Sequence, residues 1–310
     1  MDDCPSRSCS RLSRRLGLGL FLLAGLLSAC GESVDTRLEI THPFSLFGLI
    51  NPKADTHAVR IFEIKGEIEL IRAEPVNAHV RSTLMQTGAQ QAWQDSVVRL
   101  GGQDFRHVYY AAFTASAGET YKLEVIRNDG ETSTAVVTVP PPIKLDILEP
   151  DTLTPNQALM PILIRGRPPA LPRIDVEYVV VGFREEGGDP IFKPLTFNYA
   201  GRPAEVDGGW LLKIDLIADF SEIYKAFDDD SSITTDVIDL REIRLSVHVG
   251  DENWVSPAGV FDADLLAEPG LFSNVENGFG YFGSGYVESV VFRPPAVLIR
   301  RAGFYVIGSN

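Results

Sequence analysis

Alternation of apolar and polar residues with a period of two is the feature that most constrains how this chain folds. Tyr121, Leu123 and Val125 alternate with Lys122 and Glu124. Residues 242–249 (EIRLSVHV) repeat the pattern, with an apolar side chain at every second position. Because successive side chains of a strand point to opposite faces of the sheet, this pattern predicts strands with one buried and one solvated face, as in antiparallel sheets.

Turn and helix signals complete the predicted architecture. Further strands are predicted at residues 59–64, 107–114, 134–139, 174–183, 210–217 and 287–292. The turn sequences 128–130 (NDG) and 207–209 (DGG) are typical of hairpins. Residues 219–227 (DFSEIYKAF) have helical spacing, with Asp219 or Ser221 as the candidate cap. We therefore predict a mainly β protein of immunoglobulin-like or related β-sandwich domains, with one short helix in the second.

Three consecutive prolines suggest where the domains divide. A chain of 310 residues has room for about two domains, and residues 140–142 (PPP) favour a stiff, extended connector. The predicted N-terminal sandwich spans residues 37–139, the proline linker residues 140–142, and a C-terminal β-rich domain residues 143–310.

The first thirty residues resemble the leader of a bacterial lipoprotein. Arg14 and Arg15 precede fourteen uncharged residues at 16–29, which are too few to span a bilayer but suit the apolar region of a signal peptide. Residues 27–30 (LSAC) resemble a lipobox, whose cysteine is acylated with chains such as palmitate and becomes the mature N-terminus. We predict a signal peptide at 1–29, lipidation of Cys30 and a lipidated tether at 30–36. An ordinary cleaved signal with a chance cysteine is the alternative. After the lipidated cysteine, an aspartate in enterobacterial lipoproteins resembles a signal for retention in the inner membrane. This chain has Gly31 there, which favours the outer membrane, on its periplasmic or outer face.

Charge and cysteine content exclude several classes of function. The chain has 28 basic and 42 acidic residues, and a formal net charge of −14 opposes binding to nucleic acid. Cys4 and Cys9 lie in the predicted leader, and Cys30 is the predicted lipidation site. The predicted mature protein therefore has no thiol for a disulfide, a nucleophile or a metal ligand.

Three phrases carry a family resemblance. They are residues 117–125 (AGETYKLEV), 133–142 (STAVVTVPPP) and 271–283 (LFSNVENGFGYFG). Together they resemble an uncharacterised family of lipid-anchored envelope proteins of Gram-negative bacteria, known as a domain of unknown function. The resemblance implies a β-sandwich protein of the cell envelope with an accessory role near TonB-dependent outer-membrane receptors. It implies no reaction and no catalytic residue.

An acidic stretch is the one candidate for a metal site. Asp228, Asp230, Asp236 and Asp239 occupy positions one, three, nine and twelve of a twelve-residue calcium loop. Position six, where such loops need glycine, holds Ile233, and position twelve lacks the longer glutamate. A solvated acidic loop is the preferred interpretation, and no metal is predicted.

Glycines and aromatic residues mark the candidate binding surface. Residues 278–283 (GFGYFG) match the G-x-G-x-x-G string, but strand and not helix is predicted after them, so no cofactor is expected. We interpret the segment as a packed structural loop that also has a candidate ligand-facing role. Phe279 and Tyr281 within it, with Trp93 and Trp254 between polar neighbours, are the candidate partner or ligand surface. For the two tryptophans, packing in the core or in a loop is the preferred interpretation.

The function predicted from the sequence is binding and not catalysis. The chain has no H-E-x-x-H and no G-x-S-x-G motif. We predict a non-enzymatic accessory protein, tethered to the membrane, with an outer-membrane receptor as candidate partner. The alternative is an envelope enzyme that acts on glycans through paired carboxylates. Carboxylates gathered in a deep cleft, or a histidine with a carboxylate there, would favour the enzyme, and an exposed aromatic or apolar patch would favour the partner surface.

Overall fold

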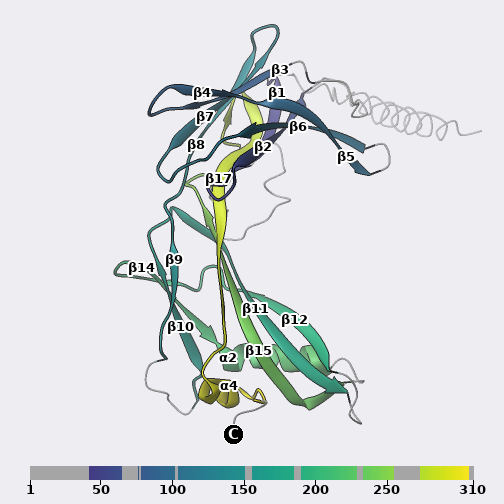
Figure 1. Ribbon diagram of the computed structural model, residues 1–310, viewed down its shortest axis with the longest axis vertical. Coiled ribbons are helices and arrows are strands. Elements are labelled where there is room, and N and C mark those ends of the chain that lie inside the picture. The colour runs from purple at the N-terminus through teal and green to yellow at the C-terminus, as the bar shows by residue number, and fades with distance from the viewer. Residues whose placement is uncertain are drawn as a thin grey trace, which may run out of the picture. The chain divides into compact units, whose positions relative to one another are not determined.

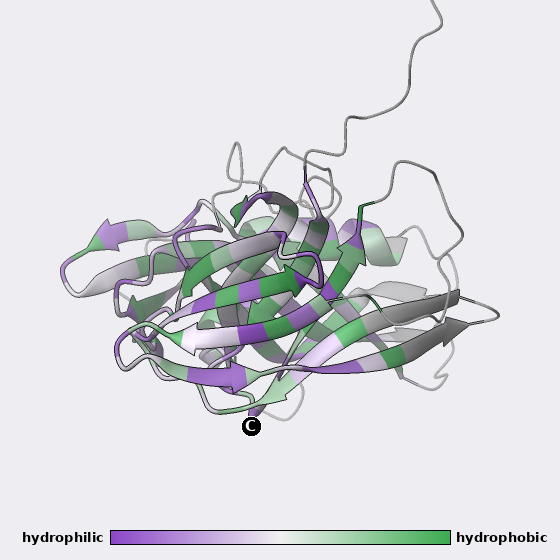
Figure 2. Cartoon of the chain, turned by 90° about the horizontal axis from the view of Figure 1, so that it is seen from above, coloured by the Kyte–Doolittle hydropathy of each residue, from purple (hydrophilic) through white to green (hydrophobic). Residues whose placement is uncertain are grey.

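Strands dominate the chain, as the alternation predicts. The computed structural model describes residues 42–64, 76, 78–101, 104–150, 156–184, 190–228, 233–254 and 273–306. Along the strands in Figure 2, hydrophobic and hydrophilic residues alternate. The first eight strands are β1 (Phe44–Ile50), β2 (Thr56–Glu63), β3 (Ala78–Leu84), β4 (Ala89–Ala92), β5 (Gln94–Gly101), β6 (Asp104–Ala112), β7 (Thr120–Arg127) and β8 (Thr132–Thr138).

The later elements follow the three prolines and include both described helices (Figure 1). They are β9 (Lys144–Ile147), β10 (Leu159–Arg165), β11 (Ala170–Arg184), β12 (Ile191–Asn198), β13 (Ala204–Val206), β14 (Gly209–Asp215), α2 (Leu216–Asp228), β15 (Ile233–Gly250), β16 (Val275–Glu276), β17 (Gly278–Phe292) and α4 (Ala296–Ala302). The predicted hairpin turns lie between β7 and β8 and between β13 and β14, and α2 contains the predicted helix.

Three sheets form two sandwiches. An eight-stranded sheet has the order β12-β11-β15-β17-β1-β2-β6-β5. Its β1 side shares a hydrophobic core with the five-stranded sheet β16-β8-β7-β3-β4, and we call this the first sandwich. Its β11 side shares a core with the four-stranded sheet β13-β14-β10-β9 and with the two helices, and we call this the second sandwich. The predicted mainly β sandwich fold is confirmed.

The second sandwich contains a buried carboxylate beside helix α2. The helix begins after Asp215, whose Oδ1 accepts hydrogen bonds from the N–H groups of Ile217 (3.1 Å) and Ala218 (3.2 Å). Asp215 is therefore the cap, and the prediction of Asp219 or Ser221 was wrong. Asp219 instead points into the core, where its Oδ2 accepts hydrogen bonds from the hydroxyls of Tyr178 (2.5 Å) and Tyr199 (2.6 Å).

Helix α4 was not predicted. It follows the two prolines that end β17, and it buries Leu298, Ile299 and Ala302 against the second core. Seven residues are too few to show a clear helical period in the sequence.

Strand β17 belongs to both sandwiches. Residues 278–284 pair in parallel with β1, and residues 285–292 pair antiparallel with β15. Val275 in β16 pairs with Ala135 in β8, and the Phe282 side chain is fully buried in the first core. The predicted domain division placed all of residues 143–310 in the second domain, whereas residues 275–284 complete the first sandwich. All described residues belong to one compact unit, residues 41–310.

The predicted signal peptide, Cys30 and tether lie outside the described residues. Within the described ranges, no helix has the length and apolar character needed to cross a membrane.

Candidate binding site

Two paired glycines lie where β17 passes from one sandwich to the other, and neither has a side chain to cover the sheet there. Gly250 at the end of β15 pairs with Gly285 in β17. A Cβ atom on Gly250 would lie 2.5 Å from the Cδ1 and Cγ atoms of Trp254. The indole therefore lies directly on the glycine, and any side chain at position 250 would displace it.

Trp254 is held in this position by both its backbone and its ring. Its N–H donates to the carbonyl of Asp251 (3.2 Å), which closes a short turn after β15. Its indole Nε1 donates to the carbonyl of Ser284 (3.2 Å), and its ring meets Tyr281 edge to face, with ring centroids 5.4 Å apart. These contacts together hold the indole in one position.

The Trp254 indole borders a pocket of about 230 Å³ at the junction of the two sandwiches. The residues that line it come from β11, from β17, and from β1 and β15 with the turns that follow them. They are mostly apolar: Leu49, Asn51, Pro172, Arg173, His248, Val249, Trp254, Gly285, Tyr286 and Val287. The volume is smaller than that of most drug-sized pockets and suits a single side chain or ring.

The polar side chains that line the pocket include no carboxylate among the described residues. The Nε2 atom of His248 lies 3.6 Å from Oδ2 of Asp175, and the same oxygen accepts a hydrogen bond from Arg173 Nε (2.7 Å). Burial lowers the pKa of His248 from its usual value, although the Asp175 charge opposes this, and the shift favours the neutral imidazole. Asp175 is held by Arg173 and does not line the pocket. This arrangement offers hydrogen-bonding groups beside an apolar surface.

Behind the pocket, Asp251 fixes the turn that carries Trp254. Its side chain is fully buried and accepts hydrogen bonds from the N–H of Asn253 (2.8 Å), the N–H of Ser284 and the hydroxyl of Tyr281 (3.3 Å). Burial raises the pKa of Asp251 to about 6, and these hydrogen bonds oppose that shift in part. Burial, together with the Asp251 charge, also raises the pKa of Tyr281.

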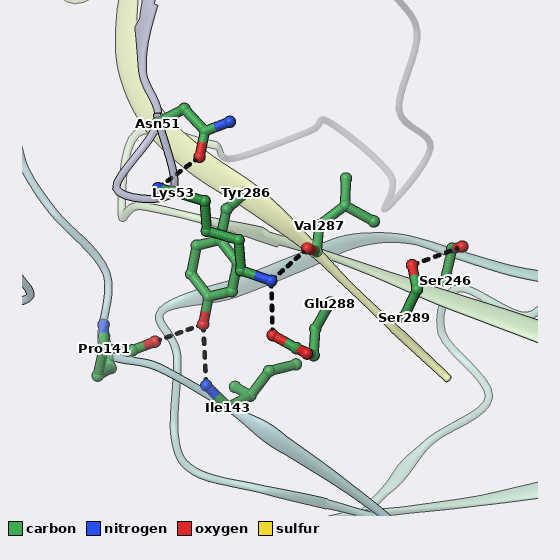
Figure 3. Close-up of polar contacts among 9 residues, drawn as sticks. All are labelled: Asn51, Lys53, Pro141, Ile143, Ser246, Tyr286, Val287, Glu288 and Ser289. Carbon is green, nitrogen blue, oxygen red and sulfur yellow. Dashed lines mark hydrogen bonds and ion pairs between the residues drawn. The ribbon is translucent and has the colours of Figure 1, made fainter. Parts of the chain in front are cut away.

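Tyr286 and Lys53 tie the pocket to the proline connector and to the turn after β1 (Figure 3). The Tyr286 hydroxyl donates to the carbonyl of Pro141 (2.9 Å) and accepts from the N–H of Ile143 (2.9 Å). Lys53 Nζ lies 5.0 Å from the centre of the Tyr286 ring and donates to the carbonyl of Val287 (2.7 Å). It also forms an ion pair with Glu288 (2.7 Å).

The four aromatic residues predicted as a surface do not come together. Trp93 is only 6% exposed, packs in the first core and donates from Nε1 to the hydroxyl of Ser82 (3.0 Å), so it has the core role that was preferred and is not part of a surface. Tyr281 is 7% exposed and lies behind the pocket, where it bonds Asp251. Phe279 is half-buried against His42, with ring centroids 4.6 Å apart. Of the four, Trp254 lines the pocket.

The segment interpreted as a packed loop is in fact part of a strand. Residues 278–283 form the first half of β17, and Gly280 is needed because a Cβ there would collide with the carbonyl of Leu46. The positive φ of 102° at Gly280 also favours glycine.

The calcium candidates give no described site. Asp239 is fully buried and pairs with Arg241 (2.9 Å) and Arg293 (3.5 Å). The side chains of Asp228, Asp230 and Asp236 lie outside those that the structure describes. Within the described side chains, no group of three or more histidines, cysteines and acids is placed to hold a metal ion.

Sequence reasoning missed the other lining residues, among them Leu49, Arg173, His248 and Tyr286. The one signal that could have found the site is the pair of glycines at 250 and 285, of which Gly250 ends the alternating run 242–249. No protein-family model matches the chain, and no curated protein matches it either.

Proposed function

We propose that this protein is a lipid-anchored binding protein of the Gram-negative outer membrane, and that it holds its partner through the pocket beside Trp254. The leader with its lipobox and the family resemblance support the location. The pocket supports the mode of action, because strands, a clamped indole and the Tyr286 hydrogen bonds hold it in one shape.

The observation that carries the binding role is apolar surface at the rim of the pocket. Leu49 and Val287 both line it and are 37% and 40% exposed. Exposed apolar side chains around a shaped depression are typical of surfaces that a partner covers. The candidate partner is an outer-membrane receptor, as the resemblance implies.

The competing role, hydrolysis of envelope glycans by paired carboxylates, receives less support from this pocket. Two carboxylates must face one another across a substrate, and none lines the pocket in the described ranges. Among the described residues, the carboxylate beside His248 is that of Asp175, which pairs with Arg173 and does not line the pocket.

Affinity capture of the full-length, membrane-anchored protein from detergent tests the binding role. Val287→Glu places a charge at the pocket rim, and Val297→Glu places the same charge on α4, where Val297 is also exposed. We expect an outer-membrane receptor to be recovered with the parent protein and with Val297→Glu, but not with Val287→Glu. Equal recovery with both variants would contradict the proposal. So would recovery of the protein alone together with turnover of an envelope polymer.

The anchor has a separate test. Cys30→Ser should abolish metabolic labelling with palmitate and release the protein from the membrane fraction, because the thiol is the acceptor of the lipid. Labelling that persists in this variant would exclude Cys30 as the lipidation site.

A further inference from the structure

The two halves of β17 differ in what covers the two edges of the strand. In the first half, β1 covers one edge, and polar groups bond the backbone on the other. The Asn274 side chain accepts from the N–H of Phe282 (2.9 Å) and donates to its carbonyl (2.7 Å), as a neighbouring strand would. The N–H of Asp251 donates to the carbonyl of Ser284 (2.9 Å), and the Asp251 carboxylate accepts from the Ser284 N–H. The backbone groups of Phe282 and Ser284 are therefore all hydrogen-bonded.

The second half is open on the side where β1 would continue. The ladder with β1 stops at Ile50, opposite Ser284, whereas β17 runs on to Phe292. Since backbone groups of alternate residues point to opposite edges, and the Ser284 groups face Asp251, those of Val287, Ser289 and Val291 face the open edge. In the described part of the chain, no strand pairs there, and Lys53 makes the one hydrogen bond to these groups, at the Val287 carbonyl.

We infer that residues 287–291 of β17 are a docking edge for an extended segment of the partner protein, which adds a strand in line with β1. This inference rests on the proposed binding function and deepens it. The ladder of donors and acceptors is complementary to a peptide backbone, and strand addition is a common mode of peptide recognition. The docking edge begins at Val287, which also lines the pocket, so a side chain of the added strand can enter the pocket beside Leu49.

The chemistry of the edge specifies an uncharged segment of β-branched or other apolar residues. Val287 and Val291 are 40% and 56% exposed and would contact every second side chain of the added strand. The nearby charges are already paired, Lys53 with Glu288 and Arg173 with Asp175. A charged side chain on the segment would find no free counter-charge here.

Lys53 protects the edge in the unbound protein. Its ammonium donates to the Val287 carbonyl at the position where a strand N–H would donate, and lysines on sheet edges commonly prevent unwanted pairing. The side chain is about half exposed and can swing aside when the partner strand arrives.

Hydrogen exchange on the unmodified full-length protein is the first test. The amide hydrogens of Ser289 and Val291 should exchange faster than those of Glu288 and Val290, which face β15. They should become protected when the captured receptor is bound. Slow exchange of Ser289 and Val291 in the free protein would overturn the inference, because the edge would then be covered already.

A pair of variants at one position is the second test. Ser289→Pro removes the N–H at the open edge and leaves the ladder to β15 intact, whereas Ser289→Ala keeps that N–H and removes only the hydroxyl that bonds Ser246 (3.0 Å). We expect capture of the receptor to fall roughly tenfold with Ser289→Pro and to be unchanged with Ser289→Ala. Capture retained by Ser289→Pro but lost by Val287→Glu would overturn strand addition and leave the proposed function standing. No capture by the parent protein would overturn both.

Discussion

The two sandwiches differ in how much of the chain each needs. The second sandwich takes its whole core from residues 143–306. Within that range, β16 and the first half of β17 belong to the first sandwich instead. The first takes most of its core from residues 44–139, but it also needs Val275 and Phe282 from far along the chain. Because one strand completes both, we expect the sandwiches to unfold together even though each has its own core.

Truncation of Phe282 is the strongest way to break that expectation. Phe282→Ala should lower the free energy of unfolding by about 3–5 kcal/mol, because it opens a cavity in the first core. Leu212→Ala makes a smaller cavity in the second core, where Leu212 is also fully buried. Calorimetry and hydrogen exchange should show one transition in both variants. Two separate transitions in either would show that β17 does not couple the sandwiches.

The crossing point between the sandwiches should make stability depend on pH. The pKa of Asp251 is about 6 in the folded protein against 3.8 for an ordinary aspartate, so the folded state holds a proton that the unfolded state releases between those values. Its contribution to stability is therefore present below pH 3.8 and lost as the pH rises through 6. The loss amounts to about 3 kcal/mol.

The measurement compares denaturant unfolding of the parent and of Asp251→Asn across pH 4–7. The loss of stability with rising pH should be smaller in the variant. Asp207→Asn, in the exposed hairpin turn, controls for the removal of one negative charge. Equal slopes in the parent and Asp251→Asn would exclude a proton on Asp251 in the folded state.

The buried carboxylate of the second sandwich provides a smaller test, confined to one core. Tyr178→Phe removes one of the two hydroxyls that donate to Asp219, and we expect a loss of about 2 kcal/mol in unfolding free energy. Tyr110→Phe removes a hydroxyl from an exposed pair with Gln94 and should change stability far less. A similar effect of the two variants would mean that Asp219 is not held by Tyr178.

The smallest effect is expected on the outer face of the second sandwich. Arg244 pairs there with Glu177 (3.0 Å) and Glu242 (2.6 Å), and all three side chains are solvent-accessible. Arg244→Ala should cost less than about 1 kcal/mol, and added salt should reduce the difference further. A larger, salt-insensitive loss would show that this face contributes more to folding than its exposure suggests.

The sequence predicted what is local and missed what is distant. Alternation at 121–125 and 242–249 gave strands, and glycine turns gave hairpins, because both signals lie within a few residues. The parallel pairing of Phe44 with Gly278 has no such signal, since more than two hundred residues separate the two strands. The proline run at 140–142 therefore marks where the chain leaves the first sandwich, and nothing local marks where it returns.

The candidate site was predicted in part, for the same reason. Trp254 was identified by its polar neighbours, and it lines the pocket. Trp93 has polar neighbours too, but it packs in the first core with its indole N–H bonded to Ser82, which flanking residues cannot reveal. Arg173 and His248 reach the pocket through the register of β11 with β15, which only the assembled sheet shows.

The parallel ladder between β1 and β17 also has a mechanical consequence. A pull applied along β1 from its N-terminal end acts parallel to this ladder. The hydrogen bonds from the Phe44–Gly278 pair to the Ile50–Ser284 pair are then loaded in shear, so they resist together and do not break one after another. Force entering at the N-terminal end of β1 would pass directly into the one strand that both sandwiches share.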